Sequence, residues 1–286
     1  ARSPSGRNSH PTPRRTALGA VETIALTDEI TISAVADATP VGFVGQPEVF
    51  QGEVWVMRDL LSNVLVQSGN DASTALAEAA GGTVEDFVTM MNAKAAALGM
   101  DDTTFRNPHG LDDAEHLSTA RDLVTMGRAA LDYPAVLEIA RVKHITLKIA
   151  GREIEMDATD RDLGVFPGLF GLKTGDTASA GQVLLSYTVT QHDRIVAVVL
   201  GTPDRRSATR EIVTWAMTAL GPRDRFFGLI AGTDLALSLP EWYQPRLNAA
   251  GGIFTGNPEP PDRTPLIDDL NQRFRELLPE LLGGNP

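Results

Sequence analysis

The chain contains no cysteine, so it has no disulfide bond, no thiolate metal ligand and no cysteine nucleophile. This absence does not identify a compartment, because many exported proteins also lack cysteine. No uninterrupted apolar run approaches the roughly 18 residues that a membrane-spanning helix needs, and the first residues lack the charged-then-apolar pattern of a signal peptide. The sequence predicts no transmembrane segment, and its start at Ala1 fits a processed form or a fragment.

Positive charge is scarce, since 25 lysines and arginines stand against 37 aspartates and glutamates, for a formal net charge of −12. Nucleic-acid binding is disfavoured, because contacts to phosphates need clustered lysine and arginine side chains. The chain has 286 residues, of which 42% are hydrophobic. This length and composition suit one large domain with short additions at its ends.

Lysine itself is rare. The chain has only four lysines, and the residues that precede them by three positions are apolar: Lys94 follows Met91, Lys143 follows Ala140, Lys148 follows Ile145 and Lys173 follows Phe170. No serine therefore stands three positions before a lysine. The sequence lacks the Ser-x-x-Lys arrangement, in which a serine nucleophile and its lysine base lie one helical turn apart.

Composition divides the chain into four parts. Residues 1–15 are rich in Ser, Pro and Arg and contain no acid, which predicts a disordered basic arm. Residues 16–220 carry the apolar patterns of a globular domain. Residues 221–265 are expected to form a Gly/Pro-rich linker, and residues 266–286 a short amphipathic helix and tail. That helix carries four acids and two arginines, which favours docking on protein over an anionic membrane surface.

Helices and strands follow one another within residues 16–220. The clearest helix spans residues 84–98, where Thr83 and Asp86 predict a capping box. Further helices are expected over residues 16–22, 57–66 and 208–220 and after residues 118–122, and a short strand at 30–32. Strands are expected over residues 142–149, 153–156, 171–175, 182–190 and 194–200, with a turn at 150–152.

The strand at residues 194–200 includes an apolar run without a polar break, which suits a strand that is covered on both faces. Helices precede and follow the strand patterns. The sequence therefore predicts an α/β (α+β) fold, in which helices flank a mostly antiparallel sheet on both faces.

Four short segments carry a resemblance to a known family: Ser68-Gly69-Asn70, Asn107-Pro108-His109-Gly110, Ser118-Thr119-Ala120-Arg121-Asp122 and Lys173-Thr174-Gly175. In this order and spacing they resemble the serine-type D-alanyl-D-alanine carboxypeptidases, which are low-molecular-mass penicillin-binding proteins, over about residues 16–220. The resemblance implies a β-lactamase/transpeptidase-like fold and hydrolysis of peptidoglycan stem peptides that end in D-Ala-D-Ala. It also implies an exported protein on the cell-wall side of a bacterial membrane, periplasmic or extracellular, without a cofactor.

The resemblance implies roles for the residues of two motifs. Ser68 and Asn70 would line one wall of the catalytic site, where they shuttle a proton and hold the substrate amide. Lys173 and Thr174 would meet the terminal carboxylate of the peptide from the opposite wall. The positive charge of Lys173 would also lower the pKa of nearby groups.

Residues beside Lys173 complete the expected substrate site. Gly175 belongs to the same motif, and the backbone N–H of Asp176 would occupy the oxyanion position. Arg205 or Arg206, after the 194–200 strand, is a candidate for a charged fork that binds a carboxylate. The alternative for both arginines is a solvated surface position.

The nucleophile and base of the family have no counterpart here. Alignment of residues 16–31 with the family's helix and following strand places the expected serine on His10 and the expected lysine on Pro13. Histidine has no hydroxyl, and proline has no ionisable group. About two N-terminal strands of the family also have no counterpart in residues 1–15. Truncation of the start is therefore a further explanation, and it predicts an exposed sheet edge and poor solubility.

Two functions remain open on these grounds. The first is a serine-type D-alanyl-D-alanine carboxypeptidase-family protein that acts on peptidoglycan stem peptides, by a serine acyl-enzyme mechanism in the family. The missing Ser-x-x-Lys leaves the activity of this chain open, and it reacts with β-lactams only if a nucleophile exists. The alternative is a non-catalytic module that binds D-Ala-terminated peptides or a cell-wall partner. A β-lactamase is less favoured, because class A enzymes carry Ser-Asp-Asn where this chain carries Ser68-Gly69-Asn70.

A metal site is an alternative interpretation of one acidic, histidine-containing segment. His109 and His116 flank Asp112, Asp113 and Glu115, which are residue types that bind metal ions. The resemblance instead implies that Asn107-Pro108-His109-Gly110 is a structural loop and that the chemistry needs no metal.

Overall fold

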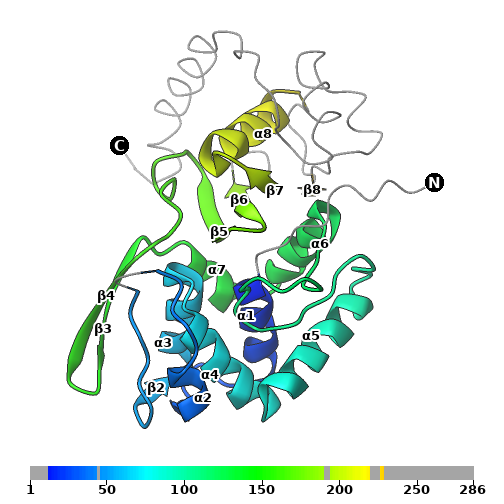
Figure 1. The fold of residues 1–286 in the computed structure, drawn as a ribbon. Coiled ribbons are helices and arrows are strands. Elements are labelled where there is room, and N and C mark those ends of the chain that lie inside the picture. Colours follow the sequence, from blue (N-terminus) through cyan, green and yellow to red (C-terminus); the bar gives the residue numbers. More distant parts are fainter. Residues whose placement is uncertain (1–11, 44–45, 190–193, 220–225, 229–286) are drawn as a thin grey trace, which may run out of the picture.

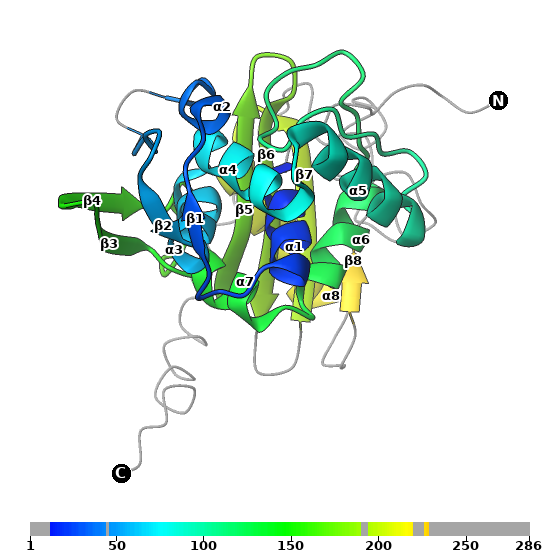
Figure 2. The same cartoon turned by 90° about the horizontal axis from the view of Figure 1, so that it is seen from below.

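The computed structural model describes residues 12–43, 46–189, 194–219 and 226–228. These residues form a sheet with helices on both faces and, beside it, a larger helical region (Figures 1 and 2). The expected terminal helix at 266–286 lies outside the described residues, as does the expected linker except for residues 226–228. Among the described residues, no helix is both long and apolar enough to cross a membrane.

The main sheet has four strands in the order β5-β6-β7-β8, and these are β5 (Leu169–Thr177), β6 (Gly181–Val189), β7 (Arg194–Thr202) and β8 (Phe226–Gly228). Neighbouring strands are antiparallel except β7 and β8, which are parallel. Helix α8 (Arg205–Ala219) covers one face, and α6 (Ala120–Ala130) packs on the other. The predicted fold class is confirmed.

The close approach of α6 to the sheet depends on Gly127. A Cβ atom at this position would lie 2.9 Å from both Leu185 Cδ1 and Val196 Cγ1. Ile195 to Val199 are each at most 1% exposed, so the apolar run in β7 is covered on both faces, as its sequence predicts. Two helices thus hold the sheet from either side.

The helical region contains the remaining helices and a two-stranded sheet. Its elements are α1 (Thr12–Thr23), β1 (Glu29–Thr31), α2 (Ala34–Asp37), β2 (Val54–Val56), α3 (Met57–Ser62), the π-helix η1 (Asn63–Gln67), α4 (Asn70–Gly81), α5 (Val84–Ala97) and α7 (Pro134–Ala140). Helix α1 packs on α4 and η1, and Figure 2 shows it in front of the main sheet, near α6. Thr83 caps α5 as expected, because its Oγ1 accepts from the Asp86 N–H at 3.0 Å and donates to Asp86 Oδ2 at 2.9 Å.

Helix α1 begins earlier than the sequence predicts. Thr12 to Arg15 were assigned to the basic arm, but their backbone forms the first turn of α1. Pro13 is compatible with this position. The N–H groups of the first helical turn have no acceptor within the helix, and proline has no backbone N–H to leave unpaired. The other residues of the predicted arm, 1–11, lie outside the described residues.

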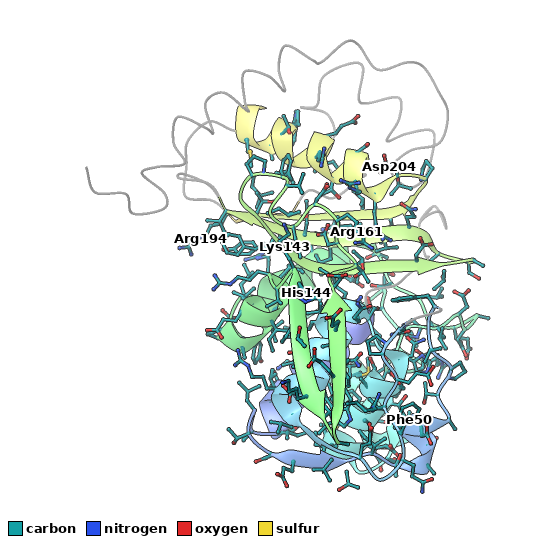
Figure 3. The ribbon with its side chains drawn as sticks, turned by 90° about the vertical axis from the view of Figure 1, so that its left-hand side faces the viewer. Phe50, Lys143, His144, Arg161, Arg194 and Asp204 are labelled. Atoms are coloured by element: carbon teal, nitrogen blue, oxygen red, sulfur yellow. The ribbon has the colours of Figure 1, made fainter. Side chains whose placement is uncertain are left out.

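Strands β3 (His144–Ile149) and β4 (Arg152–Asp157) form a hairpin. The turn at Ala150 and Gly151 uses positive φ angles of 49° and 79°, and such turns match the twist of hairpin strands. Both strands were expected, but the hairpin is a separate two-stranded sheet and not part of the main sheet. Figure 3 shows it running from His144 down along the helical region toward Phe50.

Arg152 ties this hairpin to the helical region. Its Nε and Nη2 each donate to one carboxylate oxygen of Glu53 at 2.8 Å, and its guanidinium carbon lies 4.6 Å from the Phe50 ring centroid. A bidentate pair with a stacked arene is stronger than an ordinary surface ion pair. The pKa of Glu53 is lowered, because hydrogen bonds from Trp55, Phe50 and Arg152 outweigh the burial that opposes ionisation.

Candidate functional site

The helical wall of the site is built where α3 changes into η1. The sequence predicts a helix over residues 57–66; the structure has α-helix to Ser62 and π-helix from Asn63 to Gln67. Ser68 ends it in the left-handed conformation, with φ 65° and ψ 37°. A π-turn and a non-glycine residue with positive φ are both uncommon, and both occur preferentially at functional sites.

Gly69 is required by close packing in this wall. A Cβ atom on Gly69 would lie 2.0 Å from Asn63 Oδ1 and 3.2 Å from Ala72 Cβ. A side chain at the middle position of Ser68-Gly69-Asn70 would require Asn63 to move, which gives the glycine a steric explanation. Helix α4 begins at the next residue, Asn70.

The sheet wall is β5, in which Lys173 is only 2% exposed. Lys173 Nζ donates to Ser68 Oγ at 2.6 Å and to the Thr174 carbonyl oxygen at 2.7 Å. Ser68 itself is half-buried. The structure thus brings together two residues that lie 105 positions apart, joining an accessible hydroxyl to a shielded amine.

Thr159 connects the two walls. Its backbone N–H donates to the Val66 carbonyl oxygen at 3.1 Å, and its Oγ1 lies 2.6 Å from Thr174 Oγ1. Val66 belongs to η1 and Thr174 to β5. Sequence reasoning missed Thr159, because a lone threonine between β4 and β5 belongs to no motif.

Asn70 is anchored to a neighbouring loop by its side-chain amide. Its side chain is 5% exposed, and Nδ2 donates to the Pro40 carbonyl oxygen at 2.9 Å. This hydrogen bond directs the amide nitrogen to the loop after α2. Asn70 therefore contributes to the shape of the helical wall.

Of the two candidate arginines, only Arg205 contacts β5. Arg205 Nη1 donates to the Gly175 carbonyl oxygen at 3.1 Å and lies 3.7 Å from Asp176 Oδ2. Arg206 Nε instead donates to Asp162 Oδ1 at 2.8 Å. The structure therefore places Arg205 beside Gly175 and Asp176, and Arg206 beside Asp162.

Two buried aspartates in the segment between β4 and β5 have pKa values that are shifted in opposite directions. Burial opposes ionisation of Asp162, but hydrogen bonds from Arg210 and Arg206 outweigh it and hold the pKa of that carboxyl below its usual value. Burial raises the pKa of Asp160, and its Oδ2 has no hydrogen-bond partner among the described residues. The segment between β4 and β5 therefore holds two different carboxylates. The charge of Asp162 is neutralised by two arginines, whereas the charge of Asp160 is poorly compensated.

The histidines of the metal alternative bind backbone groups. His109 Nδ1 accepts from the Leu111 N–H and His116 Nδ1 from the Arg106 N–H, each at 3.2 Å. His116 is 3% exposed and contacts Phe105 edge-on. In the part of the chain that the structure describes, no group of three or more His, Cys, Asp or Glu side chains is placed to hold a metal ion.

The positions expected for the family nucleophile and base are His10 and Pro13 in the sequence. His10 is outside the described residues, and the backbone of Pro13 is in the first helical turn. Ser68 and Lys173 therefore form the best-defined group of reactive side chains in the described part of the site.

Comparison with known proteins gives the family. The family model described as D-alanyl-D-alanine carboxypeptidase matches residues 16–204. The D-alanyl-D-alanine carboxypeptidase DacC of Escherichia coli is 36% identical over 205 residues, which are 67% of this chain and 49% of that protein. The enzyme DacF of Bacillus subtilis is 35% identical over 160 residues, covering 55% of this chain and 41% of DacF.

The solved structures show the same fold. The D-alanyl-D-alanine carboxypeptidase DacD from Francisella tularensis superposes with a TM-score of 0.68 at 23% identity, covering 76% of this chain and 66% of that one. The chain spans about half the length of the curated relatives it matches, with 49% of DacC and 41% of DacF covered.

Proposed function

Because the chain belongs to the D-alanyl-D-alanine carboxypeptidase family, we propose that it acts on peptidoglycan stem peptides ending in D-Ala-D-Ala. The observation that carries the proposal is the contact between Lys173 Nζ and Ser68 Oγ at 2.6 Å, in a chain that matches the family over residues 16–204. This substrate also sets the place of action, which is the periplasm or the extracellular cell-wall space.

The terminal carboxylate of the peptide binds at the sheet wall in this proposal. Lys173 supplies positive charge and Thr174 a hydroxyl, while Arg205 adds a second cation beside Gly175. Cationic and hydroxyl donors at one position suit a carboxylate, which accepts up to four hydrogen bonds. The backbone N–H of Asp176 is assigned to the oxyanion that develops at the scissile carbonyl.

Binding of a fluorescent peptide that ends in D-Ala-D-Ala tests this function. Lys173→Met should weaken binding about 100-fold or more, and Arg205→Gln about 10-fold, because each removes a cation from the carboxylate. Lys148→Gln is the matched control, since Lys148 is 81% exposed on the hairpin. Equal affinity for the same peptide with an amidated C-terminus would contradict the proposal.

The absence of a Ser-x-x-Lys sequence favours the second candidate, a module that binds the same peptides without hydrolysing them. Release of free D-alanine separates the two candidates. Removal of a catalytic nucleophile lowers turnover by about 10⁶-fold and can leave binding intact. Tight peptide binding without D-alanine release would support the module.

A further inference from the structure

Part of the loop between α5 and α6, residues 107–112, is attached to two distant elements. Thr16, a buried residue of α1, donates through Oγ1 to the Pro108 carbonyl oxygen at 2.5 Å. Thr177, the last residue of β5, donates through Oγ1 to Asp112 Oδ1 at 2.7 Å. Pro108 and Asp112 are four residues apart, so they are separated by at most about 14 Å. The loop therefore connects the helical region directly to the strand that lines the peptide site.

Hydrogen bonds within the loop make this connection stiff. Asn107 Oδ1 accepts from the Gly110 N–H at 2.6 Å, and Asn107 Nδ2 donates to the Leu111 carbonyl oxygen at 2.9 Å. His109 Nδ1 accepts from the Leu111 N–H. Gly110 has a φ of 86°, a left-handed conformation that glycine adopts without strain. A loop with this internal bonding holds its two attachment points at a fixed separation.

Asp112 binds the turn between β5 and β6 through both of its carboxylate oxygens. In addition to the bond from Thr177, its Oδ2 accepts from the Ser179 backbone N–H at 3.3 Å. The Thr177 hydroxyl also accepts from the Ala180 N–H at 3.1 Å, so its direction is fixed. Hydrogen bonds to an ionised carboxylate are stronger than those between neutral groups. One side chain thus fixes both the end of β5 and the turn that follows it.

The end of β5 benefits from this support because β5 is the outer strand of the main sheet. Among the described strands, β5 pairs with β6 alone, and the end of an outer strand opens more easily than a strand that is paired on both sides. Thr177 directly follows Asp176, whose N–H is assigned to the oxyanion, and Gly175, whose carbonyl oxygen accepts from Arg205. The direction of these backbone groups depends on what fixes Thr177.

We propose that Asp112 is a positioning residue of the peptide site. Through the turn between β5 and β6, it fixes the backbone of Gly175 and Asp176, where the terminal D-alanine of the peptide binds. Asp112 itself contacts neither the peptide nor a reacting atom. The inference rests on the proposed function, because the backbone that Asp112 positions belongs to the D-Ala-D-Ala site.

Affinity for the fluorescent D-Ala-D-Ala peptide tests this role. Asp112 is exposed, so Asp112→Ala should leave the thermal unfolding midpoint within about 2 °C of the unmodified chain. Its affinity for the peptide should fall about 10-fold, because the turn loses both attachments. Asp113→Ala is the matched control. Asp113 is the neighbouring exposed acid and accepts from the Glu115 N–H within the same loop, so this variant should bind the peptide normally.

Substitutions at Thr177 separate positioning from a loss of negative charge. Thr177→Val removes the hydroxyl and should weaken peptide binding about 5-fold, whereas Thr177→Ser keeps the hydroxyl and should bind within about twofold of the unmodified chain. Because Asp112 acts through this hydroxyl, Asp112→Ala combined with Thr177→Val should bind about as well as Asp112→Ala alone. Fully multiplicative effects would overturn the connection.

Amide hydrogen exchange reports on the turn without any ligand. Exchange in residues 176–182 should be about 10-fold faster in Asp112→Ala and unchanged in Asp113→Ala. Equal exchange in both variants would overturn the fixation of the turn by Asp112.

The outcomes distinguish this inference from the proposed function. If the unmodified chain binds the D-Ala-D-Ala peptide and Asp112→Ala binds it equally well, the inference is overturned and the proposed function stands. If Asp113→Ala weakens binding as much as Asp112→Ala, loss of charge explains the effect and the positioning role is overturned. A folded, unmodified chain that does not bind the peptide overturns both.

Discussion

The two walls of the site differ in how their backbone is made. The helical wall combines a π-helix, a serine with positive φ and a glycine whose Cβ would lie 2.0 Å from Asn63 Oδ1. The sheet wall is strand β5, which pairs with β6 in continuous register from Leu172 to Thr177, and its special feature is a buried lysine side chain. The comparison shows that one wall presents its functional group through an unusual backbone and the other through an unusual side-chain environment.

Gly69→Ala tests the helical wall and should have the largest effect. Because the new Cβ would lie 2.0 Å from Asn63 Oδ1, the turn at Ser68 must move, and we expect a loss of about 3 kcal/mol in the free energy of unfolding. Urea denaturation measures it. In a double-mutant cycle, Asn63→Ala should reduce this loss, and strictly additive effects would contradict the steric explanation.

Asp162→Asn tests the support behind the sheet wall. It removes the carboxylate that Arg206 and Arg210 bind at 2.7 Å. Both arginines are partly exposed and recover hydration, so we expect a loss of about 2 kcal/mol at pH 7.

The pH dependence of this loss has a definite sign. The pKa of Asp162 is lowered in the folded protein, so its stabilising contribution is present above the unfolded value of about 3.9 and disappears as pH falls through the folded value. The difference in unfolding free energy between Asp162→Asn and the unmodified chain should shrink below about pH 4. A difference independent of pH would contradict the ion-pair explanation.

Thr159→Val tests the connection between the walls. Valine keeps the shape and the backbone bond to Val66 but loses the hydroxyl that lies 2.6 Å from Thr174 Oγ1. Affinity for the D-Ala-D-Ala peptide should fall about 5- to 10-fold, with a loss of about 1 kcal/mol in stability. Thr159→Ser retains the hydroxyl and is the matched control, so a similar fall in both variants would exclude this role.

Asp160→Asn should have the smallest effect on the free energy of unfolding, and this effect is opposite in sign to that of Asp162→Asn. The pKa of Asp160 is raised, so stability from its protonated form is present below about pH 3.9 and is lost as pH rises through the folded value. At pH 7 the variant should be more stable by up to about 1 kcal/mol, because it removes a buried charge. This gain should vanish at pH 3, and destabilisation at pH 7 would contradict it.

The secondary structure of the sheet wall could be predicted from the sequence, whereas that of the helical wall could be predicted only in part. Residues 171–175, 182–190 and 194–200 have strand patterns that β5, β6 and β7 confirm, because burial on a sheet leaves a readable apolar run. The pattern over residues 57–66 predicts a helix, but the spacing of apolar residues does not distinguish an α-helical turn from a π-helical turn. The left-handed Ser68 follows from tertiary packing around Asn63 and Gly69.

Two helices beside the site escaped prediction for different reasons. Residues 70–77 of α4 are all buried although half of them are polar, so the sequence shows no apolar stripe with a period of 3.6 residues. Helix α7, Pro134–Ala140, has only seven residues, which is too short for a clear pattern. The role of Thr159 depends on a contact across 15 residues to Thr174, and no local motif encodes it.

The 105-residue separation between Ser68 and Lys173 also determines when the site comes into existence. As the chain leaves the ribosome, the helical wall is complete long before β5 is synthesised. Contacts between such distant residues form late, because closing a long loop costs entropy that only the assembled sheet repays. A partly synthesised or partly folded chain therefore has no paired hydroxyl and amine, and the site matures only in the finished fold.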